Sequence, residues 1–122
     1  MERKFNFRNL VCYQKGRDLA GEIYKVVKTF PVEEKFALSD QLRRAAVSVT
    51  SNIAEGSGRQ SFKDQAHFIE LAYASLMEVL SQLDIALDQN FIDNNIHQRL
   101  EAMIEEEARV LSGYRASLLS KL

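Results

Sequence analysis

The sequence predicts an all-α protein whose four helices form an antiparallel bundle with up-down-up-down topology. Residues that favour helices fill most of the 122 positions, whereas proline occurs once and glycine five times, a composition that leaves little material for strands. Apolar residues recur at steps of three and four along four segments, which is the spacing of one face of an amphipathic helix. Because the connections are short, consecutive helices should be antiparallel neighbours. We expect one domain over residues 1–122, with helices at about 10–29, 40–55, 62–89 and 94–120; an open array that closes only by oligomerisation is the alternative.

The first helix is indicated by Leu19, Ile23 and Val26, which share one face at helical spacing. It should end at Phe30, because a residue that precedes proline is pushed out of the α region. The first connection therefore begins at Pro31, which is the chain's single proline.

The second helix is expected to begin after Ser39, whose hydroxyl makes a good N-cap. Asp40 then lies in the first turn, where a negative charge complements the helix dipole. The glycine-rich run from Gly56 to Gly58 follows Glu55 and indicates a C-terminal cap. Because this run follows a helix and lacks the lysine of a phosphate-binding P-loop, we interpret it as a helix stop.

The last two helices show regular inner faces. Ser61 and Asp64 have the spacing of a capping box, and Asp93 or Asn94 should cap the fourth helix. The acidic run 105–107 is expected to lie mostly outside. The apolar seam of the third helix is Ile69, Ala72, Leu76, Val79, Leu83 and Ala86, and the inner side of the fourth is Ile96, Leu100, Met103, Ile104, Val110, Leu111, Tyr114 and Leu118.

Cysteine content and hydropathy restrict the location of the protein. A single cysteine, Cys12, cannot form an internal disulfide, and no basic-then-apolar leader opens the chain, so a reducing, cytoplasmic location is expected. Charged residues interrupt every apolar run before it reaches the roughly 20 residues that a membrane helix needs. We therefore expect no membrane association.

Charge is unevenly distributed, although the net charge is only −1. Residues 1–30 carry seven basic and three acidic side chains, residues 31–64 carry five of each, and residues 65–122 carry four basic and nine acidic side chains. The balance thus runs from +4 through zero to −5. Such asymmetry suggests either a basic surface for an anionic partner or oppositely charged faces that meet in self-assembly.

A helical wheel at about 100° per residue divides the second helix into three arcs. The core arc contains Leu42, Ala45, Ala46, Val49 and Ile53, the polar arc contains Gln41, Arg44, Ser48, Ser51, Asn52 and Glu55, and the weakly apolar third arc contains Arg43, Val47, Thr50 and Ala54. Within the polar arc, Ser48 and Asn52 have the four-residue spacing that permits a local hydrogen bond. A helix with two apolar arcs has more to bury than one bundle core offers, so we expect the third arc to contact another subunit.

The charged residues of the polar arc need partners. Arg44 and Glu55 are eleven positions apart, about 16 Å along the helix axis, so they cannot pair with each other. Two interpretations remain open. The arc is either a solvated polar face or a seam at a subunit boundary, in which Arg44 bridges to an acid such as Glu70 or Glu78.

Several segments together form a family pattern. They are Phe7-x-x-Leu10, Phe30-Pro31-x-Glu33-Glu34-x-Phe36-x-Leu38, Gln41-Leu42-Arg43-Arg44-Ala45-Ala46-Val47-Ser48, Ser51-Asn52-Ile53-Ala54-Glu55-Gly56, Ala72-x-x-Ser75-Leu76-x-Glu78 and Leu111-x-Gly113. Over nearly the whole chain this pattern resembles the bacterial four-helix bundle family known as 23S rRNA-intervening-sequence proteins. Thr50 stands where the family often has proline and Ala74 where it often has glycine, which affects a kink and the closeness of helix packing but not the fold.

The resemblance implies a family of undefined biochemical role, encoded in some bacteria by insertions within large-subunit ribosomal RNA genes. The chain is also similar to the accessory protein of diversity-generating retroelements, a barrel-shaped homopentamer that binds nucleic acid and a reverse transcriptase. The resemblance thus implies a homo-oligomer, with a pentamer favoured, that serves as a non-catalytic scaffold and binds a protein partner or nucleic acid. Family-signature and interface candidates are Arg43, Arg44, Val47, Ser48, Asn52, Glu55 and Glu78.

The sequence contains no recognisable catalytic or metal-binding pattern. A di-iron bundle needs Glu-x-x-His pairs, and none occurs, so His67 and His97 are interpreted as surface or rim residues. Cys12 has no histidine or basic cluster at catalytic spacing and is interpreted as a packed thiol. We expect no enzymatic activity, no cofactor and no metal; a catalytic site assembled between subunits is the alternative.

The basic N-terminal third is the candidate for nucleic-acid recognition. Its cations alternate with Phe5 and Phe7, so they could follow a phosphate backbone while a ring stacks on a base. The competing interpretation is that the rings anchor the chain start and the charges are solvated, which the isoelectric point of about 6.1 favours, since nucleic-acid-binding domains usually have a high one. An RNA- or DNA-binding module is thus the alternative function, with candidates Arg3, Lys4, Arg8, Lys15, Arg17, Lys25 and Lys28, joined by Arg43.

Overall fold

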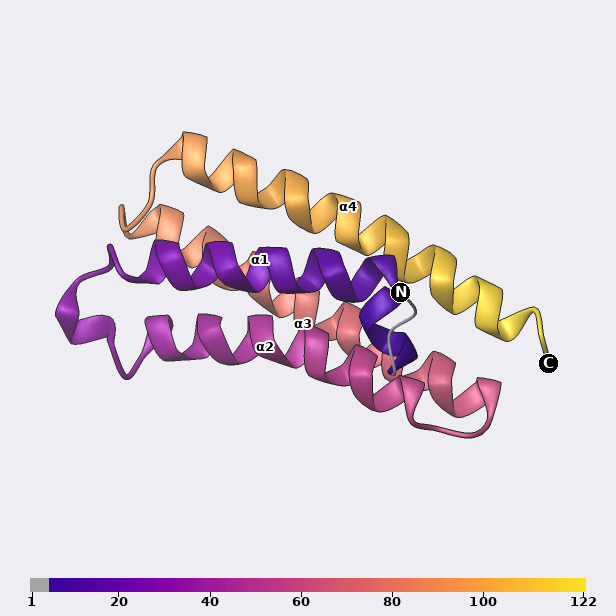
Figure 1. Cartoon of the computed structure of the whole chain (residues 1–122). Coiled ribbons are helices and arrows are strands. Elements are labelled where there is room, and N and C mark those ends of the chain that lie inside the picture. The colour runs from indigo at the N-terminus through magenta and orange to yellow at the C-terminus, as the bar shows by residue number, and fades with distance from the viewer. Residues whose placement is uncertain (1–4) are drawn as a thin grey trace.

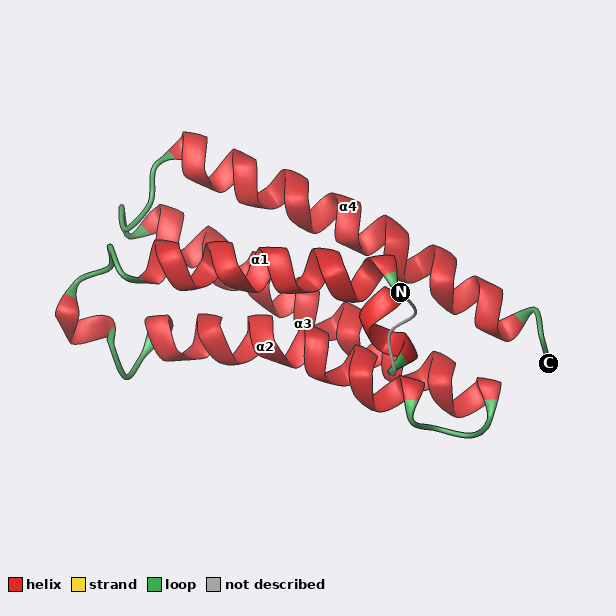
Figure 2. Ribbon diagram, in the orientation of Figure 1, coloured by secondary structure: helices red, strands yellow, loops and turns green. Residues whose placement is uncertain are grey.

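The computed structural model describes residues 5–122 as a bundle of four long helices (Figures 1 and 2). Within these residues there is no strand, and no helix is long and apolar enough to cross a membrane. The predicted all-α fold class is confirmed, and the predicted helix ends agree with the observed ones within two residues. The elements are η1 (Asn6–Asn9), α1 (Val11–Val27), η2 (Val32–Glu34), α2 (Leu38–Ser57), α3 (Phe62–Asp88) and α4 (Asn94–Leu119), where η denotes a short 3-10 helix.

Successive helices alternate in direction, so the start of α1 and the end of α4 lie toward the same end of the bundle (Figure 1). Each helix packs against the next along the chain, and α4 also packs against α1, which closes the bundle. The pairs α1 and α3, and α2 and α4, lie diagonally across the core. This is the predicted up-down-up-down arrangement.

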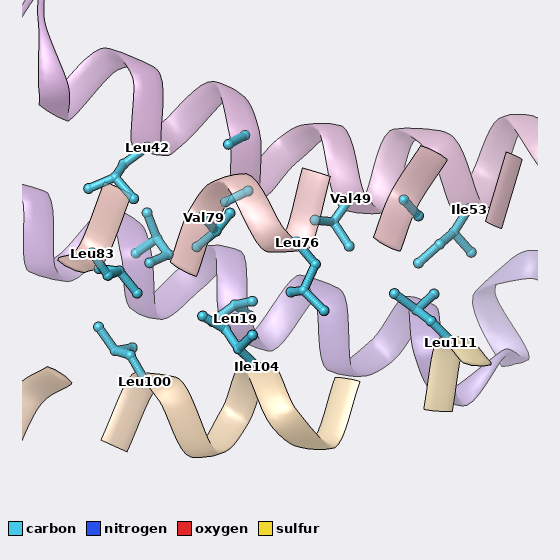
Figure 3. Close-up of a cluster of buried hydrophobic side chains, with 14 of the residues drawn as sticks. Leu19, Leu42, Val49, Ile53, Leu76, Val79, Leu83, Leu100, Ile104 and Leu111 are labelled. Carbon is cyan, nitrogen blue, oxygen red and sulfur yellow. The ribbon is translucent and has the colours of Figure 1, made fainter. Parts of the chain in front are cut away.

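The core is a stack of apolar side chains from all four helices (Figure 3). Leu19, Leu42, Leu83 and Leu100 each come from a different helix and are at most 1% exposed. Full burial of one such side chain stabilises the fold by roughly 1.5–3 kcal/mol. The predicted seam of α3 and the predicted core arc of α2 are buried along their whole lengths.

The start of α2 differs from the prediction. Ser39 does not cap the helix, because it lies inside α2 and is buried, while Ala37 occupies the N-cap position. The carboxylate of Glu34 in η2 acts instead, since its Oε1 accepts a hydrogen bond of 3.4 Å from the backbone N–H of Leu38. An acid from the preceding turn can thus begin a helix earlier than the local N-cap pattern indicates. Asp40 lies in the first turn, as predicted.

The end of α2 lies within the predicted glycine-rich run, two residues beyond the expected last residue Glu55. The helix continues through Gly56 and Ser57 and is capped by Gly58. Gly56 is buried, and an added Cβ would lie 2.9 Å from the Cβ of Phe68 and 3.3 Å from the backbone oxygen of Gln65. This glycine therefore allows α2 and α3 to approach closely, a role that local composition does not distinguish from a helix stop.

The turn between α3 and α4 is built on Asn90, whose φ of 62° lies in the left-handed region. The backbone N–H of Phe91 donates to the carbonyl of Ala86 at 2.9 Å, and that of Asn90 donates to Leu87 at 3.0 Å. This pair of bonds is the Schellman motif, which satisfies carbonyls at a helix end. Phe91 then packs against Phe30, with ring centroids 5.4 Å apart, and joins this turn to the end of α1.

The predicted caps of the last two helices are present. Ser61 Oγ accepts a hydrogen bond of 3.0 Å from the backbone N–H of Asp64, and Asp93 Oδ1 accepts one of 2.8 Å from that of Ile96. Each bond satisfies one of the N–H groups that a helix start leaves without an intrahelical partner.

Candidate interaction surface

The outer face of α2 and the adjoining side of α1 form a shallow depression of about 500 Å³, which we call the α2 depression. It unites four of the family-signature candidates with Ser51 of the polar arc and with two residues, Tyr24 and Asp40, that sequence reasoning did not assign to a site. Two of its apolar side chains, Tyr24 and Val47, are 43% and 41% exposed. The lining residues are Tyr24, Asp40, Arg43, Arg44, Val47, Ser48 and Ser51.

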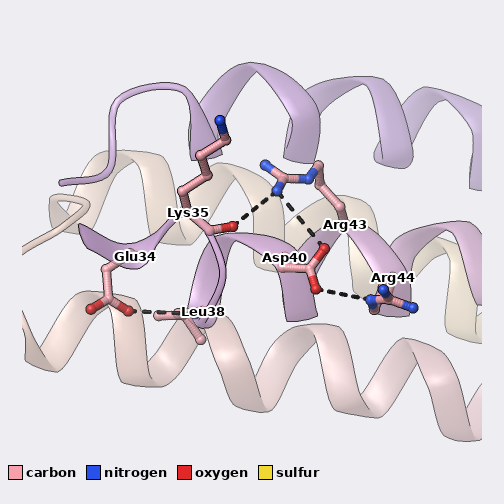
Figure 4. A network of polar contacts seen from close by, with 6 residues as sticks. All are labelled: Glu34, Lys35, Leu38, Asp40, Arg43 and Arg44. Carbon is pink, nitrogen blue, oxygen red and sulfur yellow. Dashed lines mark hydrogen bonds and ion pairs between the residues drawn. The ribbon is translucent and has the colours of Figure 1, made fainter. Parts of the chain in front are cut away.

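Asp40 is the centre of the polar contacts at one end of this depression (Figure 4). Its Oδ2 accepts a hydrogen bond of 2.9 Å from Nε of Arg44, and its Oδ1 lies 3.9 Å from Nη2 of Arg43. The same Nη2 donates to the backbone oxygen of Lys35 at 3.2 Å. The hydrogen bond and the charge of Asp40 raise the pKa of Arg44 above its ordinary value. Both arginines are thus oriented by one local acid.

Within one chain Arg44 does not bridge to Glu70 or Glu78, and a bridge between subunits stays a prediction. An acid one turn earlier on the same helix is the partner of Arg44, because the four-residue spacing places the two side chains on one face. Glu70 instead lies 3.6 Å from Arg115 of α4, and Glu78 accepts a hydrogen bond of 3.2 Å from Gln82, one turn along α3.

Ser48 and Asn52 form part of a seam between α2 and α3 within one chain. The predicted local hydrogen bond is confirmed, since Asn52 Nδ2 donates to the backbone oxygen of Ser48 at 2.9 Å and to its Oγ at 3.2 Å. Ser48 Oγ also lies 2.9 Å from Ser75 Oγ of α3. Glu55 is exposed beyond this seam, and no hydrogen bond or ion pair engages its side chain within residues 5–122. The polar arc is therefore part seam and part solvated face.

The third arc of α2 faces α1 of the same chain over most of its length. An added Cβ on Gly16 of α1 would lie 3.0 Å from Cγ2 of Thr50, which shows how closely the two helices approach. Thr50, Ala54 and Arg43 are half-buried, whereas Val47 is exposed. Part of this arc is thus buried within the chain, and Val47 is its exposed apolar residue. Contact of the arc with another subunit stays a prediction.

The outer side of α3 carries a second exposed apolar surface, which we call the acidic α3 face. Leu71, Met77 and Ile85 are 38%, 36% and 50% exposed and follow one side of the helix together with the exposed Ala74. The helix has a single basic residue, Lys63. Its acidic residues are Asp64, Glu70, Glu78, Asp84 and Asp88. In charge this face is the opposite of the α2 depression, where two arginines meet one acid.

Two of the nucleic-acid candidates are engaged by acids of their own chain. Lys15 Nζ lies 2.6 Å from Glu106 Oε1, and Lys25 Nζ lies 3.9 Å from Glu22 Oε1. These contacts reduce the positive charge that the N-terminal third presents to a phosphate backbone. Among the other nucleic-acid candidates, Lys28 is exposed. Arg3 and Lys4 lie outside the described residues.

The other two candidates lie over aromatic rings. The guanidinium of Arg8 is 5.7 Å from the ring centroid of Phe5 and 5.8 Å from that of Phe7, and the guanidinium of Arg17 is 5.8 Å from that of Tyr13. Such contacts stabilise exposed cations by about 0.5–1 kcal/mol. The rings thus have partners within the chain, which agrees with the interpretation that they anchor its start.

Glu107 is the buried residue of the acidic run 105–107, which is expected to lie mostly outside. Glu105 and Glu106 are exposed, as expected for the acidic run, but Glu107 is only 1% exposed. In the described part of the chain neither of its carboxyl oxygens has a hydrogen-bond partner. Burial raises the pKa of Glu107 to about 8. The sequence signal for this burial is the spacing of Glu107, because it follows the buried Ile104 by three residues and precedes the buried Leu111 by four.

Histidine and cysteine side chains are dispersed. Among residues 5–122, no group of three or more His, Cys, Asp or Glu is arranged to hold a metal ion. His67 is exposed, and His97 is half-buried at the rim, where its side chain is 12% exposed and its Nε2 lies 2.7 Å from Asp84 Oδ1. Cys12 is buried, as predicted, and burial raises the pKa of its thiol to about 12.

These features define a closed helical bundle whose two most distinctive surfaces lie on the outside of α2 and α3. The chain belongs to the 23S rRNA-intervening sequence protein family, whose sequence model matches residues 8–113. Among solved structures, a protein of unknown function from the S23 ribosomal protein family of Bacteroides thetaiotaomicron VPI-5482 matches with a TM-score of 0.79. The match covers 86% of this chain and 98% of that one at 23% identity, so it shows the fold. No curated protein matches the chain.

Proposed function

We propose that this protein is a non-catalytic helical scaffold that self-associates into a ring. The observation that carries the proposal is the presence of two unlike outer surfaces with complementary character. The α2 depression offers Tyr24 and Val47 beside two arginines, and the acidic α3 face offers an apolar stripe beside carboxylates. A contact between two different patches of identical subunits is head-to-tail, and such contacts generate rings when the rotation closes.

Charge favours contact between the α2 depression of one copy and the acidic α3 face of the next. The side chain of Arg44 is 78% exposed although it pairs with Asp40, and Glu78 is exposed on α3. Contact between these two residues of neighbouring copies would be favourable, whereas two copies of either surface facing each other would place like charges together. The number of subunits is suggested by the similarity to the pentameric accessory protein. Such a ring would present its outer surface to a protein partner or to nucleic acid.

Oligomeric state is the direct test. Sedimentation velocity at micromolar concentration should show one defined oligomer, with five copies favoured. Val47→Glu should dissociate it, because it places a charge in the apolar centre of the α2 depression. Val11→Glu is the matched control, since Val11 is an exposed valine of α1 outside both surfaces. A monomeric wild type would contradict the proposal.

A charge reversal tests the pairing of the two surfaces. Arg44→Glu and Glu78→Arg should each weaken the oligomer, and the double variant should recover it. Failure of the double variant to recover, with both single variants weakened, would show that the two residues do not meet. An equal effect of Val47→Glu and Val11→Glu would remove the α2 depression from the interface.

The second candidate, an RNA- or DNA-binding module, rests on the basic N-terminal third. It has less support, because Lys15 and Lys25 are ion-paired with acids of the same chain. Labelled RNA or DNA should be retained at low salt and released steeply as salt rises if phosphate contacts carry the binding. Absence of retention at low salt would exclude this function.

A further inference from the structure

Glu107 lies where α1, α2 and α4 meet. Gly16 of α1 is directly against it, since an added Cβ on Gly16 would be 2.9 Å from Oε2 of Glu107. The same added Cβ would be 3.0 Å from Cγ2 of Thr50 and 3.7 Å from Cγ1 of Val49, both on α2. A residue without a side chain therefore provides the space that the carboxyl group occupies.

The surroundings of this carboxyl group do not suit a negative charge. Glu107 is 1% exposed, and neither oxygen has a hydrogen-bond partner within residues 5–122. An ionised carboxylate left unpaired in such a place is costly, so a buried acid binds a proton instead. We therefore expect the native bundle to hold Glu107 as the neutral acid at neutral pH.

Few charged or titratable groups act on Glu107. Lys15 of α1 is the nearby cation, but its Nζ is engaged by Glu106 at 2.6 Å. Cys12 of α1 is a buried neutral thiol. α2 contributes a valine and a threonine, and every buried residue of α3 is apolar. Burial is the main cause of the raised pKa of Glu107; the Lys15 charge lowers this pKa and the Glu106 charge raises it.

We propose that Glu107 is a proton-dependent latch on the seam between α1 and α4. The neutral carboxyl group is sealed between Gly16 and α2. When it releases its proton to solvent, the carboxylate reaches water and Lys15 only if α1 and α4 separate at this level. The α1–α4 interface is the least extensive of the four between neighbouring helices, so the bundle opens there while α2 and α3 stay packed.

The pH range follows from the raised pKa of Glu107, which is about 8 compared with 4.5 for an ordinary glutamate. Below the ordinary value the acid is neutral in both the folded and the unfolded chain, and the stability of the fold is undiminished. As pH rises above the ordinary value, Glu107 ionises in the unfolded chain but stays neutral in the folded chain, so the stability of the fold is lost progressively. The loss is complete above about 8 and corresponds to a fall in the folding equilibrium constant on the order of 10³-fold.

Urea unfolding as a function of pH tests the latch in the full-length protein. Wild-type stability should fall between about pH 5 and about pH 9. Glu107→Gln cannot ionise and should remove most of this fall. Glu105→Gln is the matched control, because it changes an exposed acid of the same helix that does not act on Glu107, and it should retain the fall. An unchanged pH dependence in Glu107→Gln would overturn the proposal.

If Glu107→Gln does not fold, two measurements on the wild-type protein test whether Glu107 acts as a latch. Carbon-13 NMR follows the carboxyl of Glu107, and amide hydrogen exchange compares α1 and α4 with α2 and α3 over the same pH range. A titration midpoint near 8 with faster exchange confined to α1 and α4 supports the latch. A midpoint in the ordinary carboxyl range overturns it. So does a midpoint near 8 without selective exchange, because the group would then titrate without acting on the seam.

Discussion

Gly16→Ala perturbs the contact among α1, α2 and α4 with the smallest possible change. In a helix interior this substitution normally stabilises by about 0.5–1 kcal/mol. Here the new methyl group would lie 2.9 Å from Glu107 Oε2 and 3.0 Å from Thr50 Cγ2. Thr50 is β-branched and rotates only at a cost, and the Glu107 side chain is itself buried. Overpacking of this kind costs roughly 1–3 kcal/mol.

Gly21→Ala is the matched control, because Gly21 lies on the same helix and an added Cβ there would meet no atom within 4 Å. We expect Gly21→Ala to gain up to about 1 kcal/mol in the free energy of unfolding. Gly16→Ala should instead be less stable than Gly21→Ala by about 1–3 kcal/mol. Urea unfolding followed by circular dichroism measures both values. Melting temperatures provide a second readout, at about 4 °C per kcal/mol for a domain of this size.

A double-mutant cycle identifies the atoms responsible. Glu107→Ala removes the carboxyl group, so it should recover part of the loss caused by Gly16→Ala. Combined with Gly21→Ala, it should give an additive result, because the two sites are not in contact. The reasoning is refuted if Gly16→Ala is as stable as Gly21→Ala, or if both combinations are additive.

Two further predictions follow from the same contacts. Gly56→Ala should destabilise by roughly 1–3 kcal/mol, because its Cβ would lie 2.9 Å from the Cβ of Phe68; unfolding curves should show no such loss for Gly58→Ala, where the nearest atom is 3.4 Å away. Lys15→Gln should raise the pKa of Glu107 further, because the charge of Lys15 lowers it. An NMR midpoint that does not move upward would show that this charge does not reach the carboxyl group.

The fold could be predicted because the signals that specify it are local. The seam of α3 needs only the positions of apolar residues along one helix, and the caps formed by Ser61 and Asp93 act on N–H groups three residues away. Short connections then leave few ways to arrange four amphipathic helices. Periodicity, caps and connection lengths all indicate the same bundle, and the structure has it.

The roles of individual residues in α2 were harder to predict, because several of these residues fit two roles equally well. Gly56 has the composition of a helix stop and serves as a packing contact. Asp40 complements the start of α2 and also pairs with Arg44 one turn later, so one acid serves both purposes. The residue type limits the roles that a residue can have. Only the positions of the neighbouring side chains show which of these roles it has.

Glu107 shows which signal should prevail when residue type and helical period disagree. Its charge favours solvent, but its spacing from Ile104 and Leu111 places it on the inner face of α4. Period fixes the direction in which a side chain leaves a helix, whereas the charge of a carboxyl group can be removed by a proton. Glu107 therefore keeps its position on the inner face of α4, and its carboxyl group binds a proton there. Gly16, which provides the space for the carboxyl group of Glu107, lies on another helix. The contact between these two residues can therefore be recognised only when the packing of α1 against α4 is known.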